Sequence, residues 1–204
     1  MGLGYSYEIV VPAGGVGKAL AEVAVSAPAG RREPPVEVTL PGGEKIVLPF
    51  TSRFRSEPVD CSAGGPLELD TSLMVPVDDD EVCAYADAGG LDVDPLGRVA
   101  IGYVYLTVEF ARSSSPGFAS LDFMAAATGM SLLFERSASV REVFTGLTAG
   151  SGGVCCLLDK ECVEYRVCWL NGEAVRETVP GPRFADMAEV AAEWRRPDAH
   201  RPPP

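Results

Sequence analysis

Two runs of residues in which apolar and polar side chains alternate, 36–40 and 46–50, predict a β-hairpin. A period of two places the apolar side chains of a strand on one face. Pro41 and Gly42 lie between the runs and suit the central positions of a type II turn. A second hairpin is predicted from strands at 154–159 and 163–170, which turn at Lys160 and Glu161.

Apolar residues at helical spacing predict five helices, and β-rich runs predict four further strands. The pair Ser139 and Glu142 has the spacing of a capping box at the start of one helix. The predicted helices are 15–25, 80–88, 118–128, 139–150 and 183–195. The predicted strands are 5–11, 67–77, 98–111 and 130–134, with irregular connections at 51–65 and 89–98.

The segment 98–111 is apolar on both of its alternating faces. Tyr103 and Tyr105 belong to one face, and Val104 and Leu106 belong to the other. A strand without a polar face lies inside a sheet that is covered on both sides. The sequence therefore predicts that this segment is the central strand.

Hairpins beside helices favour an α+β fold with a mixed or mainly antiparallel sheet and helices packed on one face. We expect a single globular body over residues 1–196 and a disordered tail over 197–204. A strand with a Tyr-x-Tyr pattern opens each half of the chain. An alternative is therefore that the body consists of two loosely similar halves, 1–97 and 98–196.

Composition favours a soluble bacterial protein of the cytoplasm. The chain has 204 residues, of which 47% are hydrophobic and 23% charged, as in ordinary globular proteins. No apolar run reaches the roughly 18 residues that cross a bilayer, so no membrane association is expected. Six cysteines without an export signal favour a reducing compartment. Few lysines among the basic residues, with abundant Ala, Gly, Pro and Val, favour a GC-rich genome.

One acidic segment supplies nearly all of the net charge of −12. Eleven acidic residues lie between Glu57 and Asp94, and no lysine or arginine lies between Arg55 and Arg98. Such a segment repels phosphate backbones, so we expect no nucleic-acid binding. It attracts a cationic protein partner or a divalent metal instead. The candidate binding residues are Asp78, Asp79, Asp80, Glu81, Asp92 and Asp94.

Three interpretations of these acids remain open: a solvated face, a protein-docking surface, and a metal or catalytic carboxylate site. Aspartates at the start of the helix 80–88 also suit capping and the helix dipole. Asp92, Asp94 and Gly97 match the first part of a calcium loop. Tyr103 stands where that loop requires a glutamate.

Residues 13–19, AGGVGKA, resemble the phosphate loop of partitioning-type ATPases, whose signature contains Gly-Gly-Val-Gly-Lys-Thr. The resemblance implies phosphate binding at the start of a helix. Ala19 replaces the hydroxyl residue that binds Mg²⁺, and Pro12 replaces the first glycine. We interpret the segment as a strand-to-helix turn, and we expect no ATP or GTP binding and no cofactor.

Catalytic side chains are sparse. His200 is the single histidine and lies in the predicted tail, which excludes Ser-His-Asp and Cys-His catalysis and His-ligated zinc. Cys155 and Cys156 are adjacent on a predicted strand and point to opposite faces. With Cys162 and Cys168, they are interpreted as small apolar residues and not as zinc ligands.

Arg53 and Arg55 flank Phe54, an arrangement that suits either an anion clamp or ordinary alternation at a strand end. Trp169 and Trp194 are predicted to lie in the core.

The sequence thus favours a noncatalytic cytosolic interaction protein, immunity-like or regulatory, that presents an acidic surface to a cationic protein. The alternative is a carboxylate-based or Mg²⁺/Ca²⁺-dependent enzyme without a catalytic histidine. The oligomeric state is left open.

Overall fold

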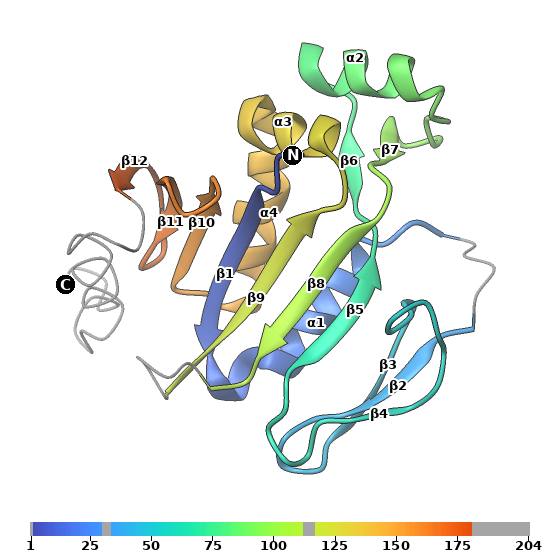
Figure 1. Cartoon of the computed structure of the whole chain (residues 1–204), viewed down its shortest axis with the longest axis vertical. Coiled ribbons are helices and arrows are strands. Elements are labelled where there is room, and N and C mark those ends of the chain that lie inside the picture. The colour runs from blue at the N-terminus through green and yellow to red at the C-terminus, as the bar shows by residue number, and fades with distance from the viewer. Residues whose placement is uncertain (1, 30–33, 112–116, 181–204) are drawn as a thin grey trace.

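The computed structural model describes residues 2–29, 34–111 and 117–180, which form an α+β fold (Figure 1). The described helices are α1 (Val16–Val25), α2 (Asp80–Gly89), α3 (Thr128–Arg136) and α4 (Ala138–Ser151), and the 3-10 turn η1 (Ala13–Gly15) precedes α1. The strands are β1 (Ser6–Pro12), β2 (Val36–Thr39), β3 (Lys45–Leu48), β4 (Val59–Asp60), β5 (Leu67–Thr71), β6 (Met74–Pro76), β7 (Arg98–Ala100), β8 (Val104–Glu109), β9 (Phe118–Ala125), β10 (Cys155–Asp159), β11 (Glu164–Leu170) and β12 (Glu173–Pro180).

Seven strands form the main sheet in the order β12-β11-β10-β1-β9-β8-β5. Every neighbouring pair in this sheet is antiparallel. The predicted α+β class with a mainly antiparallel sheet is therefore confirmed. β1 occupies the middle position, between β9 and β10, so the ranges 1–97 and 98–196 contribute interleaved strands to one sheet.

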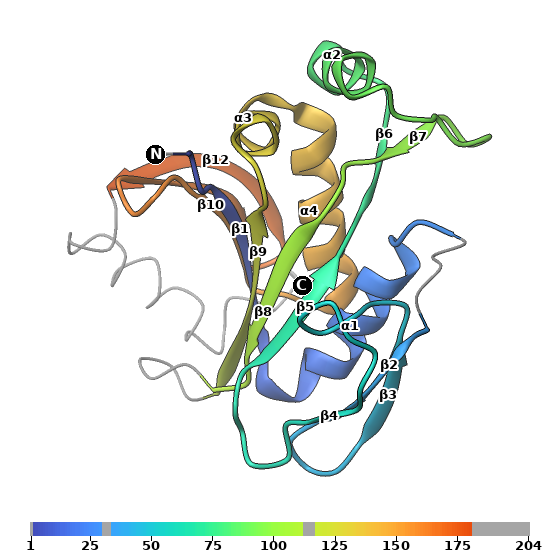
Figure 2. The ribbon, with the colours of Figure 1, turned by 45° about the vertical axis from the view of Figure 1, so that its right-hand side comes forward.

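The helices do not form a single layer. Figure 2 shows α1 and α4 beside one face of the main sheet, where they pack on each other and on β1. α3 packs on β9, β1 and α4, and α2 lies beyond the end of the sheet against α3. None of the described helices is long and apolar enough to span a membrane.

An aromatic cluster fills the space between the sheet and α4. Tyr7 of β1 stacks on Phe144 of α4, with ring centroids 4.0 Å apart and ring planes at 15°. Phe123 and Phe134 meet Phe144 edge-on, at 5.2 and 5.4 Å. The buried Tyr7 hydroxyl donates a hydrogen bond to the Phe134 carbonyl oxygen at 3.1 Å, so its polar group is satisfied. This cluster fixes β1, α3 and α4 against one another.

Both predicted hairpins are confirmed. β2 and β3 pair antiparallel, and Gly42 between them has a φ of 97°, which a type II turn requires at its third residue. β4 extends this small sheet as a parallel neighbour of β2. β10 and β11 form the second hairpin, and β12, which was not predicted, continues it.

The predictions for residues 118–134 are wrong in a reciprocal way. Residues 118–125 are strand β9 and not a helix, and 130–134 lie inside helix α3 and not in a strand. β9 buries every second residue from Ala119 to Ala125. Its alanines favour helices and therefore obscure this period of two.

The prediction of a central strand over 98–111 is also wrong. The segment is divided into β7 and β8 around Gly102, which has a φ of 91°. β8 lies between β9 and β5, near one edge of the main sheet. Its face with Val104 and Leu106 is buried, whereas Tyr103 and Tyr105 are 48% and 40% exposed. Large apolar side chains therefore mark an exposed face.

Helix α4 begins earlier than predicted. Its N-cap is Ser137, whose Oγ accepts a hydrogen bond from the Val140 amide at 3.0 Å, so Ser139 is not the cap. The predicted helix 183–195 with Trp194, the tail 197–204 and His200 lie outside the described residues.

Candidate functional site

A tight turn at residues 52–55 lies in the connection between β3 and β4. Ser52 and Arg55 exchange two backbone hydrogen bonds, of 2.8 and 3.0 Å. Arg53 and Phe54 between them have positive φ angles of 50° and 59°. Type I′ turns have this backbone and normally contain Asn or Gly, because larger L-residues are strained there. Each such residue costs on the order of 1 kcal/mol, so other contacts must hold the turn.

Asp70 of β5 supplies those contacts. Its side chain is buried, and Oδ2 accepts hydrogen bonds from the Thr51 hydroxyl at 2.9 Å and from the Phe54 amide. The Asp70 amide also donates to the Thr51 carbonyl oxygen at 2.8 Å. A buried carboxylate is tolerated only when it is hydrogen-bonded in this way. The turn is therefore fastened to the edge of the main sheet.

The turn presents Phe54 to solvent beside two exposed tyrosines. The Phe54 ring meets Tyr103 and Tyr105 edge-on, with centroids 5.7 and 6.4 Å apart. Tyr105 is paired with Met124 of β9, so their side chains share one face of the sheet. We call Phe54, Tyr103, Tyr105 and Met124 the aromatic patch. All four side chains are between 40% and 61% exposed.

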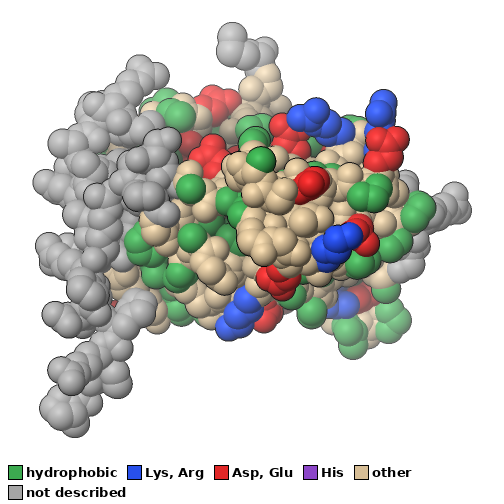
Figure 3. All heavy atoms as spheres, turned by 90° about the horizontal axis from the view of Figure 1, so that it is seen from below, with side chains coloured by type: hydrophobic (Ala, Val, Ile, Leu, Met, Phe, Trp, Pro, Cys, Tyr) green, Lys and Arg blue, Asp and Glu red, His purple; other side chains and the backbone are tan. Residues whose placement is uncertain are grey.

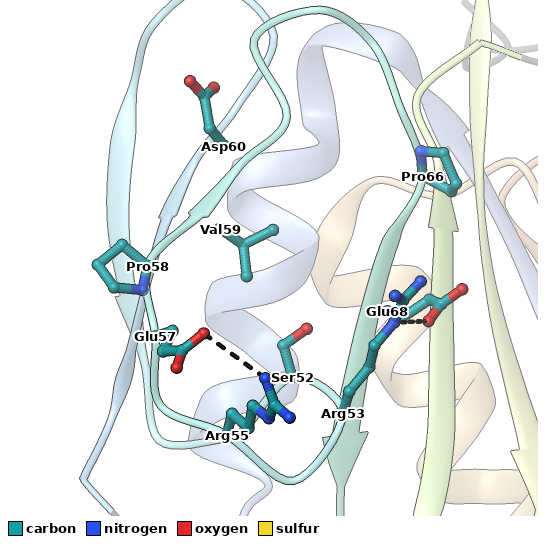
Figure 4. A pocket seen from close by; sticks show the side chains of 9 residues that line it. All are labelled: Ser52, Arg53, Arg55, Glu57, Pro58, Val59, Asp60, Pro66 and Glu68. Atoms are coloured by element: carbon teal, nitrogen blue, oxygen red, sulfur yellow. Dashed lines mark hydrogen bonds and ion pairs between the residues drawn. The ribbon is translucent and has the colours of Figure 1, made fainter.

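Two cavities adjoin this turn. The larger, of about 580 Å³, opens between the turn and the start of β5 (Figure 4). The smaller, of about 270 Å³, lies between the turn and β8 and includes Phe54 and Tyr105 in its lining. The larger cavity is lined by Ser52, Arg53, Arg55, Glu57, Pro58, Val59, Asp60, Pro66 and Glu68.

The arginines beside the larger cavity both face carboxylates. Arg53 Nε lies 2.6 Å from Glu68 Oε2, and Arg55 Nη1 lies 4.0 Å from Glu57 Oε2 (Figure 4). Figure 3 shows acidic and basic side chains interspersed over the face seen from below. This pairing does not favour the anion-clamp interpretation of Arg53 and Arg55, and such exposed ion pairs contribute little stability.

The sheet face that carries the aromatic patch is acidic. Glu68, Thr107, Asp122 and Glu8 are register partners across four neighbouring strands and lie on that face. Burial raises the pKa of Asp122, and the nearby carboxylates Asp159 and Glu109 act in the same direction against a hydrogen bond from Ser6. The strands β1, β5, β8 and β9 contain no lysine or arginine. A positive charge brought to this face would be stabilised.

The acids of the segment 57–94 lie at two ends of the molecule. Glu57 precedes β4 and Asp60 is its last residue, at one end in Figure 1, whereas α2 lies at the other end. They therefore do not form a single surface. Asp78, Asp80, Glu81 and Asp92 are exposed at or near the α2 end.

Asp79 joins two helices. It is the N-cap of α2, where its Oδ1 accepts from the Val82 amide at 2.8 Å. Its Oδ2 accepts from the hydroxyls of Ser137 and Ser139 at 2.7 and 2.9 Å and from the Ser139 amide at 2.9 Å. Partial burial acts to raise the pKa of Asp79, but these hydrogen bonds outweigh it and hold the pKa far below its ordinary value. Asp78 also accepts a hydrogen bond from Ser139.

Asp94 is likewise engaged within the chain. Its Oδ1 accepts from the amides of Leu96 and Arg98, both at 2.9 Å, and its Oδ2 lies 2.8 Å from the Arg98 guanidinium. The candidate site therefore separates into two internally bonded carboxylates, Asp79 and Asp94, and the exposed acids around them.

The glycine-rich loop before α1 lies in a setting unlike that of a phosphate loop. β1 ends at this loop with antiparallel neighbours on both sides, whereas such ATPases require parallel strands. The Glu44 carboxylate lies 3.4 Å from the position that a Cβ on Gly17 would occupy. A carboxylate beside these amides would repel phosphate.

Three of the four cysteines in the predicted group are buried, and the fourth is exposed. Cys155, Cys156 and Cys168 are buried, and Cys162 is exposed in the turn between β10 and β11. Cys155 and Cys156 belong to different apolar clusters on the two faces of the sheet. Within the described ranges, no group of three His, Cys, Asp or Glu side chains is arranged to hold a metal ion.

The sequence did not reveal the aromatic patch, because Tyr103 and Tyr105 were assigned to a covered strand. One signal was present: Phe54 lies between two arginines in a segment predicted to be irregular. In comparisons with known proteins, no family model, no curated protein and no solved structure matches the chain.

Proposed function

We propose that the protein is a noncatalytic interaction protein, immunity-like or regulatory, that binds a cationic protein partner through the aromatic patch. The observation that carries the proposal is the position of Phe54 on a strained turn beside Tyr103 and Tyr105. Strain of this kind persists where the surrounding structure enforces it, and it is typical of binding and active sites. Here the strain holds an apolar ring in solvent, where folding alone gains little from it.

The chemistry of the patch suits a protein interface. Aromatic side chains and methionine are enriched at the centres of interfaces, where they dominate the binding energy. Ring contacts with Tyr103 and Tyr105 hold Phe54 in one orientation, so little conformational entropy is lost on binding.

The charge of the surroundings supports a cationic partner. Glu68, Glu109 and Asp122 lie on the same sheet face as Tyr105, and an arginine or lysine can also lie over an exposed aromatic ring. The exposed acids Asp78, Asp80, Glu81 and Asp92 would add long-range attraction and accelerate association.

The test compares two double variants as bait for proteins from the source cell. Phe54→Ser with Tyr105→Ser removes two rings of the patch. Val93→Ser with Leu96→Ser removes two apolar side chains that are 52% and 75% exposed but lie outside it. We expect a basic protein that the wild type and the control retain, and that the patch variant binds at least about tenfold more weakly.

The purified partner then gives the electrostatic test. Its association rate should fall as salt is raised, as expected for opposite charges that attract over several ångströms. Equal retention of every protein by the two double variants would remove the patch as the binding site. A partner with a net negative charge would contradict the electrostatic part.

A further inference from the structure

A groove lined by three arginines lies between α4 and the strands β11 and β12. Two adjoining cavities, of about 250 and 340 Å³, share Arg141, Cys168, Val175 and Arg176 in their linings. Arg166 lines the smaller of the two. We call this combined space the arginine groove. Glu177 lines the smaller cavity and Glu142 lines the larger one, so the groove is surrounded by three arginines and two glutamates.

Strand alternation directs the arginine side chains of β11 and β12 toward α4. Arg166 is paired with Thr178, and Val167 is paired with Glu177. Val167 belongs to the apolar cluster on the face away from α4, so Glu177 shares that face, and Arg176, its neighbour in the strand, points to the α4 side. Glu177 is therefore directed away from α4, although it contributes to the lining of the smaller cavity.

The three arginines differ in how they are bonded. Arg166 donates to the Glu135 carbonyl oxygen at 3.0 Å and forms ion pairs with Glu135 and Glu164, at 3.1 and 3.4 Å. This fixes its guanidinium and offsets its charge. Among the described residues, neither Arg141 nor Arg176 lies within ion-pair distance of a carboxylate. In a chain of net charge −12, two such arginines on one cavity are unusual.

Cys168, which is buried and lines both cavities, lies close to the Arg141 guanidinium. Burial raises the pKa of the Cys168 thiol there, and Arg141 and Arg166 act in the opposite direction. Ala138 and Ala174 give the wall of the larger cavity an apolar character, and Thr145 and Thr178 add hydroxyls. Val175 also lines both cavities, but it packs against the apolar cluster on the face away from α4. A concave, mainly apolar space with a few converging polar groups is the usual form of a small-ligand site.

We infer that the arginine groove binds a small organic anion, whose carboxylate or phosphate is held by Arg141 and Arg176 and whose apolar body lies against Ala138 and Ala174. Guanidinium groups bind both head groups through paired N–H donors. Arg166 forms the wall of the groove on the side of β11, and its charge is offset by the ion pair with Glu135. This site is separate from the aromatic patch, so its test is independent of the proposed partner.

Three probes distinguish the head group: inorganic phosphate, phenyl phosphate and benzoate, each titrated to about 20 mM into the full chain. Thermal unfolding is followed against sodium chloride of equal ionic strength, and calorimetry gives the affinity. We expect a saturable rise in Tm of a few degrees with at least one probe, because a ligand that binds only the folded state stabilises it. A response to phenyl phosphate and phosphate assigns a phosphate head group, and a response to benzoate assigns a carboxylate.

Matched variants locate the binding. Arg176→Gln changes an exposed side chain and should leave the fold intact, and Arg141→Lys keeps the charge at a half-buried position but removes the fork of donors. Both should weaken the responding probe by at least about tenfold. Arg136→Gln, on an exposed arginine that lines neither cavity, should leave the affinity unchanged. No saturable response to any probe, or an equal affinity in Arg176→Gln, would overturn the inference.

Discussion

At the scale of single residues, two aspartates show that acidic side chains in this chain stabilise the fold as well as carrying surface charge. Asp70 holds a strained turn in place, and Asp79 connects the N-termini of α2 and α4. Both belong to the segment whose charge suggested a surface, yet their carboxylates are used inside the molecule. Formal charge counted along a sequence does not distinguish these roles, because a capping aspartate and a solvated one have the same composition.

Replacing Asp79 by asparagine should destabilise the protein. The change removes a charged acceptor from amides and hydroxyls of two helix starts, so we expect a loss of about 1–3 kcal/mol in the free energy of unfolding at pH 7. Asp80→Asn alters an exposed neighbour and serves as the control, with an expected change below about 0.5 kcal/mol. Urea unfolding followed by circular dichroism measures both.

The same variant should remove a pH dependence. The folded-state pKa of Asp79 lies below its ordinary value, so its stabilising effect is complete above the unfolded pKa of about 4. That effect is lost as the pH falls from there through the folded pKa. The stability difference between wild type and Asp79→Asn should therefore shrink between about pH 5 and pH 2. A difference that stays constant over this range would show that the charge of Asp79 is not what stabilises the helices.

At the scale of elements, the type of a helix or strand was predicted correctly where the apolar residues recur with one clear period. The prediction failed where the residue types favour one structure and the spacing of apolar residues favours another. The hairpins alternate over both strands, and helix 80–88 has a capping aspartate and a closing glycine, so each was identified. β9 contains helix-favouring alanines, and its inward alternation becomes clear only once its partners β1 and β8 are known. Tertiary pairing there outweighs local propensity.

The connection between α4 and the sheet depends on Phe144. This buried ring contacts Tyr7, Phe123 and Phe134, so Phe144→Ala should leave a cavity and cost about 3–5 kcal/mol. Phe144→Leu retains most of the volume and should cost less. Val47→Ala, at a side chain that is 64% exposed, should change stability by no more than about 0.5 kcal/mol. Denaturant titrations rank the three variants, and a loss for Phe144→Ala no larger than for Val47→Ala would contradict the packing.

At the scale of the whole molecule, the sequence did not reveal which strand is central. Strands that pair antiparallel but lie far apart in the chain leave no sign of their pairing in the local sequence. The segment 98–111 was assigned to the middle of the sheet only because both of its alternating faces are apolar. The same reasoning hid the candidate site, because Tyr103 and Tyr105 were counted as core residues. Apolar side chains exposed for binding and apolar side chains buried for folding have the same appearance in a sequence.

Thiol accessibility tests the whole arrangement of the chain. Of the six cysteines, Cys83 and Cys162 are exposed and the other four are buried, and burial raises the pKa of Cys156 and Cys168. A thiol reagent should therefore modify two groups rapidly in the native protein and all six in denaturant. Substituting both Cys83 and Cys162 by serine should abolish the rapid phase. Rapid reaction of four or more thiols would mean that the sheet is not covered as described.

The central position of β1 also has a consequence for how the chain is made. Val10 pairs with Ser120 and with Cys155, so at ribosomal speeds β1 waits about 7–30 s after its own synthesis for its second neighbour. Both of its edges are open until β9 is made, and one edge stays open until β10 follows. An open apolar strand recruits other chains. We therefore expect high-level expression to favour aggregation of the nascent chain before the sheet closes.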